Sequence, residues 1–66
     1  LMDRDTYKIE YMVGHDTLSD EPGWTLWIEP IDLDRVVKYL SWYHGGARIE
    51  LTSVELFKKG IGYKEV

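Results

Sequence analysis

The chain has 66 residues, a formal net charge of −4 and no cysteine. A chain of this length forms one domain, which we expect to span residues 2–66, with Leu1 as an addition before the initiating methionine. The missing cysteines exclude disulfides, zinc thiolate sites and thiol catalysis. We expect neither a signal peptide nor a membrane span, because the longest uninterrupted apolar runs are only a few residues long.

Charge is distributed unevenly along the chain. Residues 1–34 carry nine acidic and two basic side chains, a net charge of −7, whereas residues 35–66 carry six basic and three acidic ones, a net charge of +3. An acidic half disfavours binding to the phosphate backbone of nucleic acids and favours a basic protein surface. The alternative is that these carboxylates only solvate strands and loops, as most charge runs do.

The first half of the chain predicts two strands. Apolar and polar residues alternate from Tyr7 to Val13, which is the period of two typical of a strand with one buried face. A turn-rich segment at residues 15–23 then leads to a second strand over residues 24–29. Pro30 closes this strand because proline has no amide hydrogen to donate.

The second strand is expected to place a tryptophan on each of its faces. Trp24 lies in phase with Leu26 and Ile28, so these three side chains are predicted to face the same way, toward the core. Trp27 points to the opposite face and is expected to look outward.

A single amphipathic helix is predicted between Asp32, a natural N-cap, and His44. Four apolar residues recur at the spacing of a core-facing stripe, namely Leu33, Val36, Val37 and Leu40. At about 100° per residue, Trp42 lies nearly opposite this stripe, among charged side chains. Gly45 and Gly46 are expected to end the helix, since glycine adopts the left-handed conformation readily.

Strand-forming residues return from residue 47 onward, but the apolar positions before residue 52 are out of phase with those after residue 53. A bulge near Thr52 and Ser53 would restore a single buried face. Residues 63–66 form a short tail that either pairs as an edge strand or frays. Together these elements predict an α+β fold, a small antiparallel sheet with one helix in the order strand-strand-helix-strand.

The sequence contains no pattern that supports catalysis or metal binding. Neither His15 nor His44 belongs to a spacing that gathers three or four metal ligands, and His44 suits the C-terminus of a helix. Asp20 and Glu21 are adjacent carboxylates in a turn, where solvation is a simpler explanation than acid-base chemistry. We therefore expect no enzyme, no catalytic residue, no metal and no cofactor.

Large outward aromatic residues predict a protein interface instead. Trp27 and Trp42 both face away from the expected core, and a small chain without disulfides gains stability most simply by dimerising. Interface cores are enriched in tryptophan, tyrosine and arginine. We therefore expect a homodimer whose interface contains Trp27, Arg35, Lys38 and Trp42.

A rival interpretation is a small nucleic-acid-binding module. The outward aromatic side chains, including Tyr39 at the edge of the outer helix face, would stack on bases while basic residues contact phosphates. The basic residues are Arg35, Lys38, Arg48, Lys58 and Lys59. Because the acidic half would repel a long strand, we do not expect direct nucleic-acid binding.

The order of the predicted parts is itself informative. A tyrosine-led strand, an acidic turn, an aromatic strand, an aromatic helix ending in tyrosine and glycine, and a closing strand follow one another over residues 5–57. This order resembles the small uracil-DNA glycosylase inhibitors of some phages. That family folds as strand-strand-helix-strand, forms homodimers and mimics DNA to occupy the DNA-binding cleft of the enzyme. Helices from both protomers frame an apolar pocket that grips an apolar side chain of the glycosylase.

The resemblance implies roles for six side chains. Tyr39, Trp42 and Tyr43 would form the aromatic pocket, and the carboxylates that stand in for phosphates would be Glu29, Asp32 and Asp34. The implied partner is a host uracil-DNA glycosylase, met in the cytoplasm of a bacterial host. The alternatives are a phage or mobile-element accessory protein that inhibits a different host factor, and the nucleic-acid-binding module.

Overall fold

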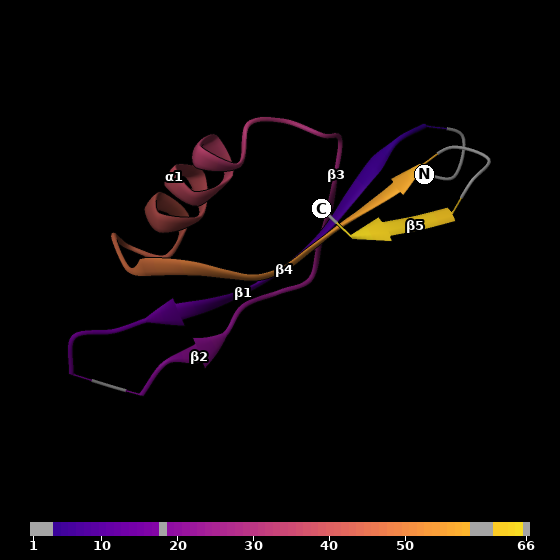
Figure 1. Ribbon diagram of the computed structural model, residues 1–66. Helices are drawn as coiled ribbons and strands as arrows, with labels where there is room; N and C mark the ends of the chain where they lie inside the picture. Colours follow the sequence, from indigo (N-terminus) through magenta and orange to yellow (C-terminus); the bar gives the residue numbers. More distant parts are fainter. Residues whose placement is uncertain (1–3, 18, 59–61, 66) are drawn as a thin grey trace.

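The computed structural model describes residues 4–17, 19–58 and 62–65, and its strands form one antiparallel sheet beside a single helix (Figure 1). In chain order the elements are β1 (Thr6–Gly14), β2 (Glu21–Pro22), β3 (Leu26–Ile28), α1 (Leu33–Tyr43), β4 (Arg48–Lys58) and β5 (Gly62–Glu65). The predicted α+β class, one helix on a small antiparallel sheet, is confirmed.

Two short strands are added to the predicted order. β2 pairs with the end of β1, within a segment that was expected to be a turn. β5 pairs with β4, with Phe57 opposite Tyr63, so the C-terminal tail forms an edge strand rather than fraying. The sheet order is β2-β1-β4-β5, and β3 pairs with β1 along the same edge as β2.

β1 is the central strand and supplies most of the core. Its alternate residues Ile9, Tyr11 and Val13 are buried, and they cluster with Val36 and Leu40 of α1. The predicted single buried face of this strand is confirmed. Full burial of an aliphatic side chain is worth roughly 1.5–3 kcal/mol, so these few residues provide much of the stability of the domain.

The chain segments on both sides of β1 carry an extra residue opposite Glu10 and Tyr11. On β4, Thr52 is left out of the ladder between the partners of Glu10 and Tyr11. The predicted bulge is confirmed, and it puts the apolar residues before and after it on one face. On the other edge, residues 23–25 stand opposite the same two residues of β1, so the chain also bulges between β2 and β3.

This second bulge shortens the predicted second strand. Regular pairing covers only β3, and Trp24 lies in the bulge. Leu26 and Ile28 pack against the core as predicted, but Trp24 is 76% exposed. The predicted burial of Trp24 is wrong because the backbone of α1 approaches β4 and does not extend over this edge of the sheet.

α1 begins and ends where its capping residues predict. The side chain of Asp32 accepts a hydrogen bond of 2.9 Å from the amide of Asp34. Gly45 and Gly46 follow the last turn with φ angles of 70° and 89°, a left-handed region that favours glycine. Trp42 is exposed, as its position opposite the apolar stripe predicts. Within the described residues, no helix has the length and apolar character to cross a membrane.

α1 covers only part of the sheet. β4 is the one described strand whose backbone approaches the helix, and β3 lies along the opposite edge of β1 (Figure 1). The chain measures 44 × 18 × 16 Å and exposes 4938 Å² of surface. A compact protein of this mass exposes about 4400 Å², so the fold leaves extra surface uncovered.

Leu40→Ala and Trp42→Ala are expected to have different effects on folding. Leu40 is 2% exposed, so its truncation leaves a core cavity and should lower the free energy of unfolding by ~2–5 kcal/mol. Trp42→Ala removes an exposed side chain and should lower it by less than about 1 kcal/mol. Urea denaturation followed by far-UV circular dichroism measures both values. Equal losses would show that Trp42 is an ordinary core residue.

Candidate protein-binding groove

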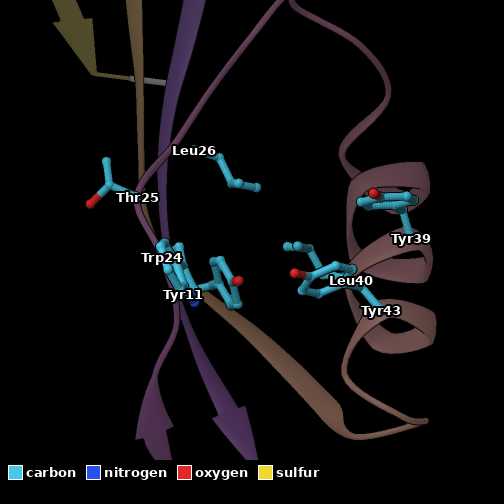
Figure 2. Close-up of a pocket in the computed structure, with 7 residues that line it drawn as sticks. All are labelled: Tyr11, Trp24, Thr25, Leu26, Tyr39, Leu40 and Tyr43. Carbon is cyan, nitrogen blue, oxygen red and sulfur yellow. The ribbon is translucent and has the colours of Figure 1, made fainter.

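Exposed aromatic residues gather on one side of the molecule. Trp24, Tyr39 and Tyr43 are 76%, 59% and 62% exposed. All three line a hollow of about 320 Å³ between α1 and the strand edge. Figure 2 shows Leu26 pointing across this hollow toward the helix, with Tyr11 and Trp24 on the strand side.

A second hollow continues the first along the helix. It has a volume of about 400 Å³ and shares Leu26 and Tyr39 with the first hollow. Its other lining residues come from the end of β3, the connection to α1 and the first half of the helix, and they are Ile28, Glu29, Ile31, Arg35 and Val36. We call the two hollows together the α1/β3 groove.

Ring contacts join the aromatic residues of the helix, two of which line the groove. Tyr39 and Tyr43 stack with ring centroids 6.3 Å apart, and the ring of Trp42 lies 6.0 Å from that of Tyr39. Tyr43 in turn meets the ring of His44 edge-on at 5.1 Å. Residues three and four positions apart share one helix surface, so the contacts of Tyr39 with Trp42 and Tyr43 follow directly from the sequence spacing.

Tyr11 ties the floor of the groove to the end of the helix. Its ring is buried, and its hydroxyl lies 2.9 Å from Nε2 of His44. On the bulged edge, the amide of Gly23 donates a hydrogen bond of 2.8 Å to the carbonyl oxygen of Tyr11. His44 therefore fixes the helix terminus to the sheet. Sequence reasoning missed this role because the two partners lie 33 residues apart in the chain.

The structure brings two of the three predicted partner-binding aromatic residues into the groove. Tyr39 and Tyr43 line it, whereas Trp42 packs on Tyr39 without lining either hollow. Sequence reasoning missed Trp24 and Ile31, which also line the groove and are exposed. The Pro-Gly turn signal just before Trp24 was the one hint that regular pairing, and with it burial, would be interrupted there.

The three predicted carboxylates have different surroundings. Glu29 lines the groove and pairs with Arg4. Asp32 caps α1, and Asp34 lies in the first turn, where its charge complements the positive end of the helix dipole. All three residues are exposed. They form an acidic edge beside the groove at the start of the helix.

The predicted dimer residues are spread over two faces. Arg35 lines the groove, and Lys38 and Trp42 are exposed on the outer side of the helix. Trp27 lies on the opposite face of the sheet, where Nζ of Lys8 is 5.6 Å from its ring centroid. Of the four predicted dimer residues, only Arg35 lines the groove.

A polar hollow of about 190 Å³ lies near the C-terminal end of α1, with His15, His44 and Arg48 in its lining. Arg48 pairs with Asp20 across 3.4 Å at an exposed position, and such pairs contribute about 0–1 kcal/mol. Within residues 4–17, 19–58 and 62–65, no group of three or more histidine, cysteine or acidic side chains is placed to hold a metal ion.

No family model matches the sequence, no curated protein matches it, and no solved structure matches the fold.

Gly23→Ala is expected to destabilise the floor of the groove, and Gly14→Ala is its matched control. A methyl group on Gly23 would overlap the buried ring of Tyr11, whereas one on Gly14 would meet the exposed guanidinium of Arg48. Overpacking against a fixed ring costs about 1–3 kcal/mol, but a flexible arginine moves aside. Urea denaturation of the two variants tests this difference. Equal stabilities would mean that the Tyr11 ring shifts without cost.

Proposed function

We propose that this protein is a phage-encoded inhibitor that acts as a homodimer and binds a host protein through the α1/β3 groove. The favoured target is host uracil-DNA glycosylase, in the cytoplasm of a bacterial host. The observation that supports the proposal is the groove itself, an apolar hollow walled by exposed aromatic rings. Monomeric proteins rarely expose large contiguous apolar patches unless a partner covers them.

The groove suits an apolar side chain of another protein. The hollow of about 320 Å³ lies at the lower end of the range of about 300–1000 Å³ that small-molecule sites occupy. The rings of Tyr39, Tyr43 and Trp24 offer flat apolar surfaces on both sides. Burying a leucine or phenylalanine between them gains roughly 1.5–3 kcal/mol, which is the contribution expected of a binding hot spot.

The charge of the chain supports a basic target. Residues 1–34 carry a net charge of −7, and the acidic edge adjoins the groove through Asp32 and Asp34, with Glu29 already paired with Arg4. A DNA-binding cleft is basic because it holds phosphates, so long-range attraction speeds the encounter. In this mechanism the carboxylates steer the two proteins together and the aromatic groove holds them.

Ion pairs within the chain weigh against the nucleic-acid-binding rival. Arg48 pairs with Asp20 at 3.4 Å, and Lys58 pairs with Asp5 at 3.8 Å. Basic side chains that face acids in their own chain attract phosphates less strongly. Lys59, the remaining basic residue of the predicted set in this part of the chain, lies outside the described residues.

The protein is expected to stop uracil excision at about one dimer per enzyme while binding no DNA itself, because its acidic half repels phosphates. The assay follows uracil release from a labelled oligonucleotide as the protein is added, beside a gel shift on the same oligonucleotide. Undiminished excision at roughly tenfold excess would remove the glycosylase as the target and leave inhibition of another host factor. A salt-sensitive gel shift would favour the nucleic-acid-binding module.

Tyr43→Ala is expected to speed dissociation of the complex by at least about 30-fold, since truncating a hot-spot aromatic costs about 2 kcal/mol or more. Tyr43→Phe is the matched control, because it keeps the ring and removes only the hydroxyl. Added salt should instead slow association, as expected for charge steering. Surface plasmon resonance with immobilised glycosylase measures both rates. An unchanged dissociation rate for Tyr43→Ala would place the contact outside the groove.

A further inference from the structure

The outer edge of β3 borders the α1/β3 groove. Among the described strands, β3 pairs with β1 alone. Its residues 26–28 include neither the lysine nor the proline that commonly protects a sheet edge, and the nearest prolines are Pro22 and Pro30. An edge of this kind presents backbone donors and acceptors to a strand of another protein.

The position of α1 leaves this edge open on the groove side. The helix approaches β4, on the far side of β1, and Trp24 near the outer edge is 76% exposed. Figure 2 shows Leu26 pointing from the strand toward the helix. A strand added outside β3 would direct every second side chain to this same face of the sheet. Those side chains would enter the groove beside Leu26 and Ile28.

The two hollows of the groove follow one another along β3. Leu26 lines both of them, Trp24 lines the first, and Ile28 lines the second. Alternate residues of a strand lie about 6.8 Å apart, and Leu26 and Ile28 have this relation. An added strand with apolar residues at positions i and i+2 would therefore place one side chain in each hollow. Its middle residue would lie beside Trp27, on the face away from the helix.

Acidic side chains stand at both ends of this edge. Glu21 lies before the bulge, Asp32 and Asp34 lie beyond β3, and all three are exposed. Residues 1–34 as a whole carry a net charge of −7. Basic residues on either side of the apolar pair would complement this charge and speed the encounter. Such residues are also what a protein surface that binds DNA phosphates contains.

We propose that the target adds a short strand to the outer edge of β3, with the sequence pattern basic, apolar, any residue, apolar, basic. Its central residues pair with Leu26, Trp27 and Ile28, which leaves the bulge at residues 23–25 outside the ladder. Backbone hydrogen bonds supply affinity, and the two hollows select the apolar residues. The inference rests on the target-binding groove of the proposed function. To the single apolar side chain held there it adds a backbone conformation and a second apolar position.

Short peptides test the pattern without the target. The probe is acetyl-Lys-Leu-Thr-Leu-Lys-amide, and its control is acetyl-Lys-Leu-Leu-Thr-Lys-amide, which has the same composition and charge. Adjacent leucines point to opposite faces of a strand, so the control fills only one hollow and should bind at least about tenfold more weakly. Titration of the isotope-labelled chain, followed by NMR, measures both dissociation constants and shows whether the amide signals of β3 shift.

N-methylation of the probe tests the backbone pairing. Successive amides of a strand point to opposite sides, so only alternate amides of the bound peptide face β3. One peptide is methylated on the amide of its central threonine, and another on the amides of its two leucines. One of them should bind as before, and the other at least about tenfold more weakly, because hydrogen bonds are lost and the methyl group meets the edge. Saturating probe should also slow amide hydrogen exchange within residues 26–28.

Ile31→Ala tests the second hollow in the chain itself. Ile31 lines that hollow, lies outside the helix and strands and is 49% exposed, so its truncation should leave the fold intact. The substitution should weaken binding of the probe at least about threefold, because apolar contact area is lost. Trp42→Ala is the matched control and should leave binding unchanged, since Trp42 is exposed and lines neither hollow. Far-UV circular dichroism verifies that each variant is folded.

Several results would overturn the strand addition. Equal binding of the two peptides, or binding of neither, would do so, as would full tolerance of both N-methylated peptides. Protection of the β3 amides in the free chain that rises with its concentration would show that a second copy occupies the edge instead.

The excision assay is read separately from these measurements. A chain that binds the probe through β3 but fails to inhibit uracil excision would refute the proposed target and leave the strand addition standing. A chain that inhibits excision while its β3 amides exchange as fast in the complex as in the free chain would do the reverse.

Discussion

The packing of Val36 and Leu40 onto the central strand fixes where the helix lies. The position of the helix decides which side of the sheet is covered and which side is exposed. These two residues are the buried ones of α1, and they cluster with the buried face of β1. Because this apolar stripe is narrow, the helix covers the β4 side of the sheet and leaves the β3 side uncovered. The aromatic flank of the helix then faces a sheet edge across an open hollow, which is the α1/β3 groove.

The two bulges beside Glu10 and Tyr11 adapt the sheet to this arrangement. An extra residue on each neighbouring strand bends the ladder and increases its twist, and the strands before and after the bulge still direct apolar residues to one face. Tyr11 stays buried at this point, and its hydroxyl meets His44 at the end of the helix. The floor of the groove and the end of its helical wall are thus held together by one buried side chain.

Charged and apolar side chains lie next to each other at the groove, and the proposed mechanism uses them at separate steps. The acidic edge acts over distance and is screened by salt, whereas the aromatic rings act only after contact. The chain has no cysteine, and few of the side chains that the structure describes are fully buried, so the stability of the domain is expected to be modest. Any partner that binds the folded form alone, including a second copy, would stabilise it by mass action.

Spacing along the chain predicts the local features of this protein. The alternation in β1, the capping of α1 by Asp32, the bulge near Thr52 and the exposure of Trp42 each follow from spacing along a single segment. The exposure of Trp24 could not be predicted in this way, because burial depends on which part of the sheet the helix covers. The same holds for the contact of Tyr11 with His44 and for the joining of Trp24, Ile31 and Tyr39 in one groove. Such arrangements bring together residues distant in the chain, and periodicity within one element carries no information about the distance between elements.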